Sequence, residues 1–350
     1  MIDWLTMELP LRHSSPVNGG KVVSIDPDGT VEWATLKRYS VRGSFEMSMA
    51  VRTCTHTLDQ CTHLSVSGNP AKFLQGHNLW GTDDIHSLVI STAERIAQLL
   101  SIDIHPDDRA QWNAGNVKLT RTDLTLMFHL RNQGEVLSWL RAAEQTGYMA
   151  HRGRGRLSNG STLYYGEKSR RWTLKAYAKG LEVRSNLNKQ PAIRDLPHAL
   201  TYADNALRVE LELKSMELKR MGLDMLSSWP TDDGQLSESL TARLLHDKLG
   251  NMTMTTTASL SPDVMQHLRP ALRMAVQAWE SGADLRQTLP RPTFYKYRKE
   301  LLPFGIDIAT LLPKDVSNVV PLHRVLEAKP VGVPDWAIGT PLYFEPRRIA

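Results

Sequence analysis

Residues 207–214 read Leu-Arg-Val-Glu-Leu-Glu-Leu-Lys, a strict alternation of apolar and charged side chains. Successive side chains of a β-strand point to opposite faces of a sheet, so this pattern predicts a strand with one apolar face and one charged face. Residues 117–128 and 171–179 alternate in a similar way. If the three strands share a sheet, its open face carries the charged residues and one tyrosine, namely Arg121, Asp123, Lys175, Tyr177, Lys179, Arg208, Glu210 and Glu212.

Helical patterns separate these strands. Thr82 and Asn132 are residue types that cap helix N-termini, and Gly147 is a suitable stop for the helix after Asn132. We therefore predict an α+β domain with an antiparallel sheet over residues 1–230. From about Ser237 the apolar spacing is helical, which predicts a mainly helical domain over residues 231–350.

Composition excludes several classes of protein. With 350 residues the chain is long enough for two domains with separate cores. Its two cysteines are too few for a disulfide framework, and the first residues lack the basic start and apolar run of a secretory signal. No segment approaches the roughly 20 consecutive apolar residues that cross a bilayer. We therefore expect a protein of a reducing cytoplasm, with no membrane partner.

Positive charge is concentrated in the middle of the chain. Residues 151–220 contain 15 Lys and Arg and 7 Asp and Glu, a net charge of +8, whereas the whole chain carries +5. Arg152, Arg154 and Arg156 alternate with glycines in a predicted basic loop. Such a local field suits a polyanion such as DNA or RNA. A solvated surface without a partner would have the same composition, so charge alone leaves both interpretations open.

The polar face of the predicted sheet has the groups that metal-assisted cleavage of a phosphodiester requires. Mg²⁺ and Mn²⁺ prefer oxygen ligands, so Asp123 and Glu210 on rigid strands could hold one of these ions against a phosphate. Tyr177 is a weak nucleophile at neutral pH, and Lys179 on the same face is placed to favour its phenolate. Either acid taken singly could be a surface residue paired with a neighbouring arginine. The coincidence of both acids and Tyr177 on one face of three strands favours the metal-site hypothesis.

Several motifs resemble those of a known family. They follow one another along the chain as residues 1–5, residues 69–84, Arg121-Thr-Asp123, Arg208-Val-Glu210, residues 318–324 and Pro334-Asp-Trp336. In these motifs the chain resembles the gene-two protein family of inoviruses, the replication initiators of filamentous phages. Residues 162–182 are also similar to the tyrosine segment of plasmid rolling-circle initiators.

The resemblance implies a nickase that initiates rolling-circle replication. Such an enzyme nicks the plus strand at the phage origin through a tyrosine, forms a 5′-phosphotyrosine link, frees a 3′-OH primer and later rejoins the displaced strand. The family pattern implies Tyr177 as the nucleophile. It also implies binding of duplex and single-stranded origin DNA, contact with host replication proteins, self-association at the origin and a place in the cytoplasm of the bacterial host. The motif residues expected to contact DNA are Arg121, Arg208 and Asn78.

The full ligand set of the metal is open. Related nickases carry a His-apolar-His metal motif, and this chain lacks one. His77, in a predicted turn, could complete the metal shell or contact a phosphate, or it could be a structural loop histidine. Two Cys and two His in residues 54–63 could bind zinc, but their spacing suits a β-hairpin better. Tyr164 and Tyr165 are rival nucleophiles, for which packing or base stacking is the more ordinary role.

The second domain contains a candidate helix-turn-helix. Three helices are predicted over residues 271–279, 284–289 and 293–302, with Thr293 as the cap of the last one. The exposed side of that helix would present to DNA the residues Tyr295, Lys296, Arg298 and Lys299. An ordinary helical hairpin with a basic surface fits the pattern nearly as well. For the whole chain, the alternative to a nickase is a non-catalytic origin-binding or repressor protein.

Overall fold

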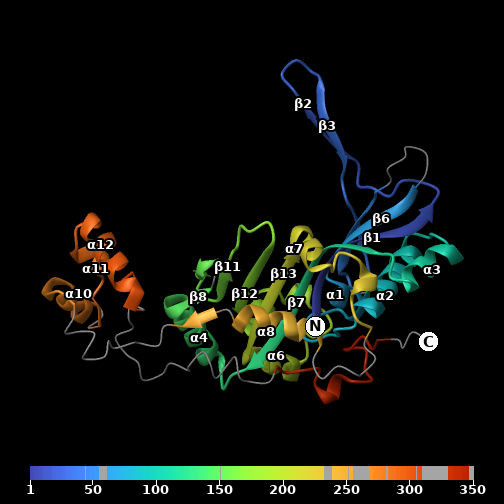
Figure 1. The fold of residues 1–350 in the computed structure, drawn as a ribbon. Coiled ribbons are helices and arrows are strands. Elements are labelled where there is room, and N and C mark those ends of the chain that lie inside the picture. The colour runs from blue at the N-terminus through green and yellow to red at the C-terminus, as the bar shows by residue number, and fades with distance from the viewer. Residues whose placement is uncertain are drawn as a thin grey trace.

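The computed structural model describes residues 1–43, 45–54, 61–149, 151–231, 239–250, 252–254, 268–280, 283–304, 306–309 and 330–346. Within these residues a nine-stranded sheet, antiparallel at every pairing, forms the centre of the molecule (Figure 1). From edge to edge its strands are β10 (Arg156–Ser158), β11 (Thr162–Tyr165), β12 (Trp172–Ala178), β13 (Ala206–Lys214), β7 (Lys118–His129), β1 (Ile2–His13), β6 (Cys61–Gly68), β5 (Ser48–Thr53) and β4 (Tyr39–Arg42).

The three alternating segments of the sequence are the adjacent strands β12, β13 and β7. Their apolar side chains face a large core, to which α2 (Ile85–Leu99), α4 (Gln133–Thr146) and α8 (Leu240–Gly250) contribute. The remaining helices before α8 are α1 (Pro70–Gln75), α3 (Pro106–Asn113), α5 (Lys179–Ser185), α6 (Pro197–Asp204) and α7 (Ser215–Met221). The fold class is therefore α+β, and the prediction that these strands share a sheet is confirmed.

The observed helix caps test two of the helix starts expected from the sequence. Asn132 caps α4, because its side-chain oxygen accepts a hydrogen bond from the backbone N–H of Glu135 at 3.0 Å, as predicted. The expected cap at Thr82 is wrong. Asp84 caps α2 instead, with its carboxylate 2.9 Å from the backbone nitrogen of Ser87, while the hydroxyl of Thr82 accepts from the backbone nitrogen of Asp84.

A second unit of helices follows in the C-terminal part. It consists of α10 (Pro270–Glu280), α11 (Leu285–Thr288) and α12 (Arg291–Leu301), which enclose a separate apolar cluster. The expected cap at Thr293 is wrong, because α12 begins at Arg291 after Pro290 and Thr293 lies inside its first turn. Pro292, the second residue of the helix, suits this start because an N–H in the first turn has no partner within the helix.

The C-terminal part of the chain also returns to the large sheet. Residues 330–346 pack beside Leu79 and Trp80, and the backbone N–H of Val331 donates to the carbonyl oxygen of Met127 at 2.8 Å. Both this segment and α8 lie in the predicted helical domain by sequence, yet they contact the first domain. The domain boundary near residue 230 stays a prediction.

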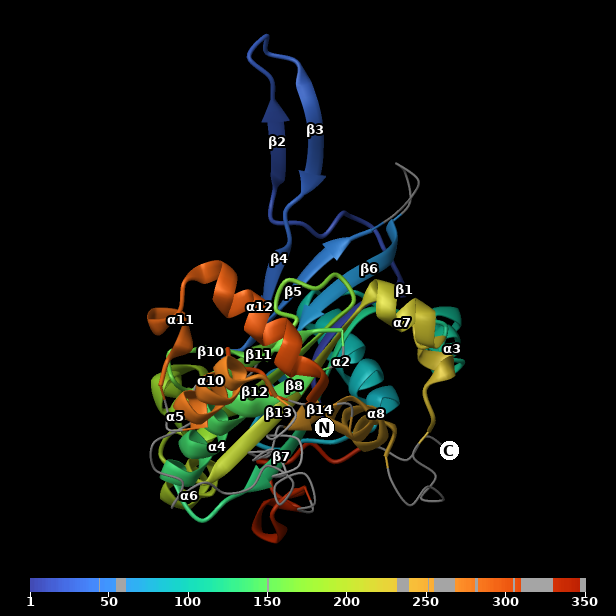
Figure 2. The same ribbon diagram turned by 60° about the vertical axis from the view of Figure 1, so that its left-hand side comes forward.

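Two smaller sheets complete the fold. One joins β14 (Met252–Met254), β8 (Gly147–Met149) and β9 (Gly153–Arg154). The other is a ribbon of β2 (Lys21–Ile25) and β3 (Val31–Leu36), which projects away from the body of the molecule in both views (Figures 1 and 2).

Candidate active site

The polar face of β12, β13 and β7 brings the predicted catalytic residues together. Across the strands, Glu210 pairs with Lys175 on one side and Thr125 on the other. In the same register Tyr177 lies opposite Arg208, and Asp123 lies opposite Glu212. Directly opposed residues of antiparallel strands share a face and have Cβ atoms roughly 5 Å apart. The alternation in the sequence therefore placed the nucleophile candidate and both acids correctly on one surface.

Asp123 is buried and forms an ion pair with the side chain of Arg121. Both of its carboxylate oxygens accept hydrogen bonds from Arg121, at 2.8 and 2.7 Å. Burial raises the pKa of Asp123 to about 7, and the nearby negative charges of Glu210 and Glu212 add to this, although Arg121 opposes it. The arginine thus compensates the charge of this carboxylate only in part.

Tyr177 is 6% exposed and donates its hydroxyl to Oε2 of Glu210 at 3.3 Å. The other oxygen of Glu210 accepts from Nζ of Lys175 at 2.8 Å, and that ammonium lies 4.9 Å from the centre of the tyrosine ring. Burial and the charge of Glu210 raise the pKa of Tyr177 well above its ordinary value. The hydroxyl is therefore protonated at neutral pH and is aimed at a proton acceptor.

Lys179 occupies a different position from the one expected. It is the first residue of α5 and is fully buried, with Nζ donating to Glu182 at 2.6 Å and to Oδ1 of Asn78 at 2.9 Å. The ammonium lies 6.0 Å from the centre of the Tyr177 ring. Burial lowers the pKa of Lys179 to about 8, and the positive charge of Arg208 lowers it further. Its influence on Tyr177 is through space, because its hydrogen bonds go elsewhere.

Asn78 is the centre of a buried polar network next to this lysine. Its side-chain nitrogen donates to Asp3 at 2.8 Å, and its side-chain oxygen accepts from Lys179 and from Gln190, both at 2.9 Å. Asn78 also lines the pocket beside Tyr177, and its contact with DNA stays a prediction. Asp3, Lys175 and Gln190 were missed as site residues. Lys175 carried a signal because it shares the strand face of Tyr177, and Asp3 carried one because it lies in the motif of residues 1–5.

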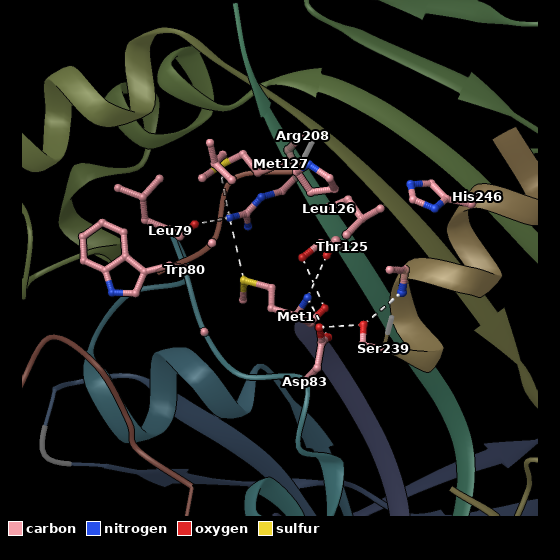
Figure 3. Close-up of a pocket in the computed structure, with 15 residues that line it drawn as sticks. Met1, Leu79, Trp80, Asp83, Thr125, Leu126, Met127, Arg208, Ser239 and His246 are labelled. Carbon is pink, nitrogen blue, oxygen red and sulfur yellow. Dashed lines mark hydrogen bonds and ion pairs between the residues drawn. The ribbon is translucent and has the colours of Figure 1, made fainter. Parts of the chain in front are cut away.

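Arg208 is buried in a second hollow, of about 320 Å³, next to the site. Figure 3 shows its side chain reaching toward the carbonyl oxygen of Leu79, between the sulfur atoms of Met1 and Met127. Nη1 lies 3.6 Å from a carboxylate oxygen of Asp3. The guanidinium is 1% exposed, and its expected contact with DNA stays a prediction.

His77 is fully buried beneath the same region. One ring nitrogen contacts the carbonyl oxygen of Leu342 at 2.7 Å, and the other accepts from the backbone N–H of Leu79 at 3.1 Å. Burial lowers the pKa of His77 to about 3, so the ring is neutral. Because both nitrogens are engaged, we leave His77 out of the ligand set proposed below.

The residues predicted to be catalytic line a pocket of about 700 Å³. Its walls include Trp4 and Tyr164, which lie on opposite sides of the Glu210 and Lys175 pair in the strand order. The rival tyrosine Tyr165 is buried and donates its hydroxyl to the carbonyl oxygen of Ala143 at 3.1 Å, which is a packing role. The pocket is large enough for one or two nucleotides and has aromatic surfaces on which bases can stack.

The expected basic loop is partly strand. Arg154 and Arg156 belong to β9 and β10, and all three arginines have partners within the chain. The guanidinium of Arg152 lies 4.1 Å from the ring centre of Trp172, and Arg156 lies 3.5 Å from Glu167. Arg156 still exposes 69% of its side chain, so it remains the most accessible of the three.

Arg154 and Arg298 meet at one carboxylate. Asp307 accepts two hydrogen bonds from Arg298, at 2.7 and 2.9 Å, and lies 3.2 Å from Arg154. Lys296 is exposed on α12 and keeps the accessibility expected of a DNA contact. Arg298 is thus tied to the end of its own helical unit.

The described part of the chain contains no group of three or more His, Cys, Asp and Glu side chains that could hold a metal ion. Cys54 and Cys61 are free at the ends of β5 and β6, and His56 lies outside the described residues. No described helix is long and apolar enough to span a bilayer.

Comparison with known proteins identifies the family. The model of the N-terminal region of the replication-associated gene-two protein matches residues 1–232, and that of its C-terminal region matches residues 266–346. The chain belongs to the family of replication-associated gene-two proteins. The gene-two protein of Enterobacteria phage I2-2 is 38% identical over 95% of each chain. That of Enterobacteria phage M13 is 22% identical and covers 96% of this chain and 98% of its own length.

Among solved structures, the rolling circle replication initiator protein from Geobacillus stearothermophilus has a TM-score of 0.32 and 12% identity to this chain. The match covers 75% of this chain and 89% of that one. The filamentous-phage family expected from the sequence motifs is thus confirmed by relatives that span nearly the whole chain.

Proposed function

We propose that this gene-two family protein initiates rolling-circle replication by nicking one strand of origin DNA with Tyr177. The observation that carries the proposal is the hydrogen bond between Tyr177 and Glu210 at the floor of a pocket that also contains Asp123. A tyrosine beside a carboxylate, with two cationic side chains nearby, is suited to attack on a phosphodiester.

The covalent step exchanges one phosphoester bond for another. The phenolic oxygen of Tyr177 attacks phosphorus, the bond from phosphorus to the 3′ oxygen breaks, and a 5′-phosphotyrosine link forms. Glu210 accepts the phenolic proton across 3.3 Å and then returns it to the leaving 3′ oxygen, which becomes the primer hydroxyl. Because the number of phosphoester bonds is conserved, the reverse reaction can rejoin the displaced strand into a circle.

Asp123 and Glu210 would hold a divalent cation. Their chemistry fits a hard ion such as Mg²⁺ or Mn²⁺, since both are carboxylates on neighbouring rigid strands and line one pocket. The ion would neutralise charge that develops on the phosphate oxygens. Arg121 and Lys175, released from these carboxylates, would face the phosphate themselves.

The DNA strand is proposed to enter across the polar face. Arg121 exposes 36% of its side chain at the pocket, where it can meet a phosphate. Tyr164 and Trp4 offer stacking surfaces for unpaired bases on either side of Tyr177. Arg156 and Lys296 would bind flanking duplex. Association with host replication proteins follows only from the family resemblance.

The test is a nicking assay on a supercoiled plasmid that carries the phage origin, with Mg²⁺. The wild-type protein should yield nicked circles and a peptide with a nucleotide attached to Tyr177. Tyr177→Phe should abolish both while it retains origin binding, because the ring still packs, and Tyr164→Phe should keep nicking activity. Full nicking by Tyr177→Phe would move the nucleophile elsewhere, and no nicking by the wild-type protein would favour the origin-binding or repressor alternative.

A further inference from the structure

The ribbon of β2 and β3 exposes an unusual amount of apolar surface. Val23, Ile25 and Val31 are 42%, 61% and 56% exposed, and Trp33 is 53% exposed. The ribbon forms its own two-stranded sheet and projects from the body of the molecule (Figure 2). An isolated two-stranded hairpin is marginally stable in water, and clustered exposed apolar side chains typically mark an interaction surface.

One face of the ribbon is almost continuously apolar. The register pairs Val23 with Ala34 and Ile25 with Val31, and opposed residues share a face. The other face is mixed, because Val22 pairs with Thr35 and Ser24 with Trp33. This face consists of Val23, Ile25, Val31, Ala34 and Leu36, with Lys21 opposite Leu36 at the base end.

Charge is divided between the two ends of the ribbon. The tip carries three acidic residues and no basic one, namely Asp26, Asp28 and Glu32. The base carries three basic residues and no acidic one, namely Lys21, Lys37 and Arg38. An acidic tip disfavours the phosphate backbone of DNA as its partner.

We propose that the apolar face of this ribbon pairs with the ribbon of a second copy of the chain, in antiparallel orientation about a two-fold axis. In that arrangement the acidic tip of each ribbon lies against the basic base of the other, and the apolar faces cover each other. Two-fold interfaces require a surface that complements itself, and a ribbon with opposite charges at its ends has this property.

The size of the ribbon sets the strength of the contact. Strands of five or six residues are roughly 20 Å long, so one face offers on the order of 200 Å², far below the roughly 800 Å² per partner of a stable interface. The pairing is therefore weak between free molecules and is strengthened when two copies bind one DNA molecule and raise their local concentration.

Disulfide trapping tests the geometry without requiring DNA or catalysis. The two-fold axis passes near the pair Val23 and Ala34, so Ala34→Cys, in a chain with Cys54→Ser and Cys61→Ser, should cross-link to itself on mild oxidation. Val22→Cys in the same background is the matched control, because it is exposed on the other face and should form few dimers. Equal trapping at both positions, with equal thiol accessibility, would overturn the proposed face.

Charge reversal tests the orientation. In the Ala34→Cys background, a tip variant (Asp28→Lys with Glu32→Lys) or a base variant (Lys21→Glu with Lys37→Glu) should each reduce the trapping rate roughly tenfold, because like charges then oppose. An equimolar mixture of the two, one of them isotope-labelled, should recover heterodimers. Asp103→Lys with Asp195→Lys is the charge-matched control for the tip variant and should trap like the parent.

Two outcomes would overturn the pairing. One is a tip and a base variant that trap as fast as the charge-matched control. The other is a mixture that recovers no heterodimer although both variants remain folded by circular dichroism. If the tip variant instead gained or lost affinity for DNA while the trapping rate was unchanged, the partner of the ribbon would be DNA.

Discussion

Glu210 lies between Tyr177 and Lys175 and uses one carboxylate oxygen for each, at 3.3 Å to the hydroxyl and 2.8 Å to the ammonium. Tyr177 and Lys175 share one strand face, and Glu210 reaches both from the neighbouring strand. This single carboxylate thus connects the proposed nucleophile to a cation. Apart from loss of the Tyr177 hydroxyl itself, its substitution should therefore affect the chemistry more than any other change in the pocket.

Glu210→Gln should reduce nicking by about 10²- to 10⁴-fold, the usual range for loss of a general base, with little loss of stability. The amide oxygen can still accept from Lys175, so the ion pair is replaced by a hydrogen bond from the ammonium to a neutral group. Nicking rates with Mg²⁺ and thermal melts of the folded protein measure the two effects. Glu212→Gln, on the same strand face, is the control and should retain most activity.

Asp123→Asn should weaken the dependence of cleavage on Mg²⁺ or Mn²⁺, so that more ion is needed for the same rate. The neutral amide is a poorer ligand and leaves Arg121 without its charged partner. Titration of the rate with each metal, and calorimetric binding of Mn²⁺, would measure this. Cleavage by the wild-type protein that persists in EDTA would contradict a metal role altogether.

Substitutions of Arg152 and Arg156 should have different effects, the first on stability and the second on DNA binding. Arg152→Gln removes the stacking of a guanidinium on Trp172 and should cost about 0.5 to 2 kcal/mol of stability, measured by urea unfolding. Arg156→Gln should leave stability unchanged but lower the log-log salt slope of duplex binding by roughly 0.9, if it contacts one phosphate. A salt slope unchanged by Arg156→Gln would mean that the duplex passes elsewhere.

Substitutions of Lys296 and Arg298 should also differ, the first affecting DNA affinity and the second stability. If α12 reads bases, Lys296→Ala should cost about 1 to 3 kcal/mol on the origin duplex and much less on a scrambled one. Arg298→Ala should instead destabilise the helical unit by about 1 kcal/mol, because the guanidinium pairs with a partly buried Asp307. Equal losses of binding free energy on both duplexes in Lys296→Ala would mean that the unit binds DNA without regard to sequence.

Acid should destabilise the protein through His77. Its pKa is about 3 in the folded state and about 6.5 in an unfolded chain, so between these values the unfolded state binds the extra proton. Stability contributed by the neutral ring is present above pH 6.5 and is lost as the pH falls toward 3, with a slope approaching about 1.4 kcal/mol per pH unit. His77→Gln should be less stable at pH 7 but flatter between about pH 6.5 and 4.5 in urea unfolding.

Strand faces could be read from the sequence, whereas the partners of each side chain could not. Alternation with a period of two placed Asp123, Tyr177 and Glu210 together because the strand register preserves faces across a sheet. Lys179 follows the last residue of the strand and starts a helix, so the same periodicity misplaced it. Asp3 joins the site through contacts 75 residues apart in the chain, as its bond to Asn78 shows, and no local pattern reports such contacts.

Because residues 330–346 return to the large sheet, the helical unit of α10, α11 and α12 is an insertion and not a tail. The chain leaves the sheet after α8 and comes back at Val331. The ion pair between Asp307 and Arg154 adds a contact between this unit and β9. Any duplex that the unit binds is therefore joined to the polar face of the sheet by both chain connections, and the protein itself limits how far apart the two can lie.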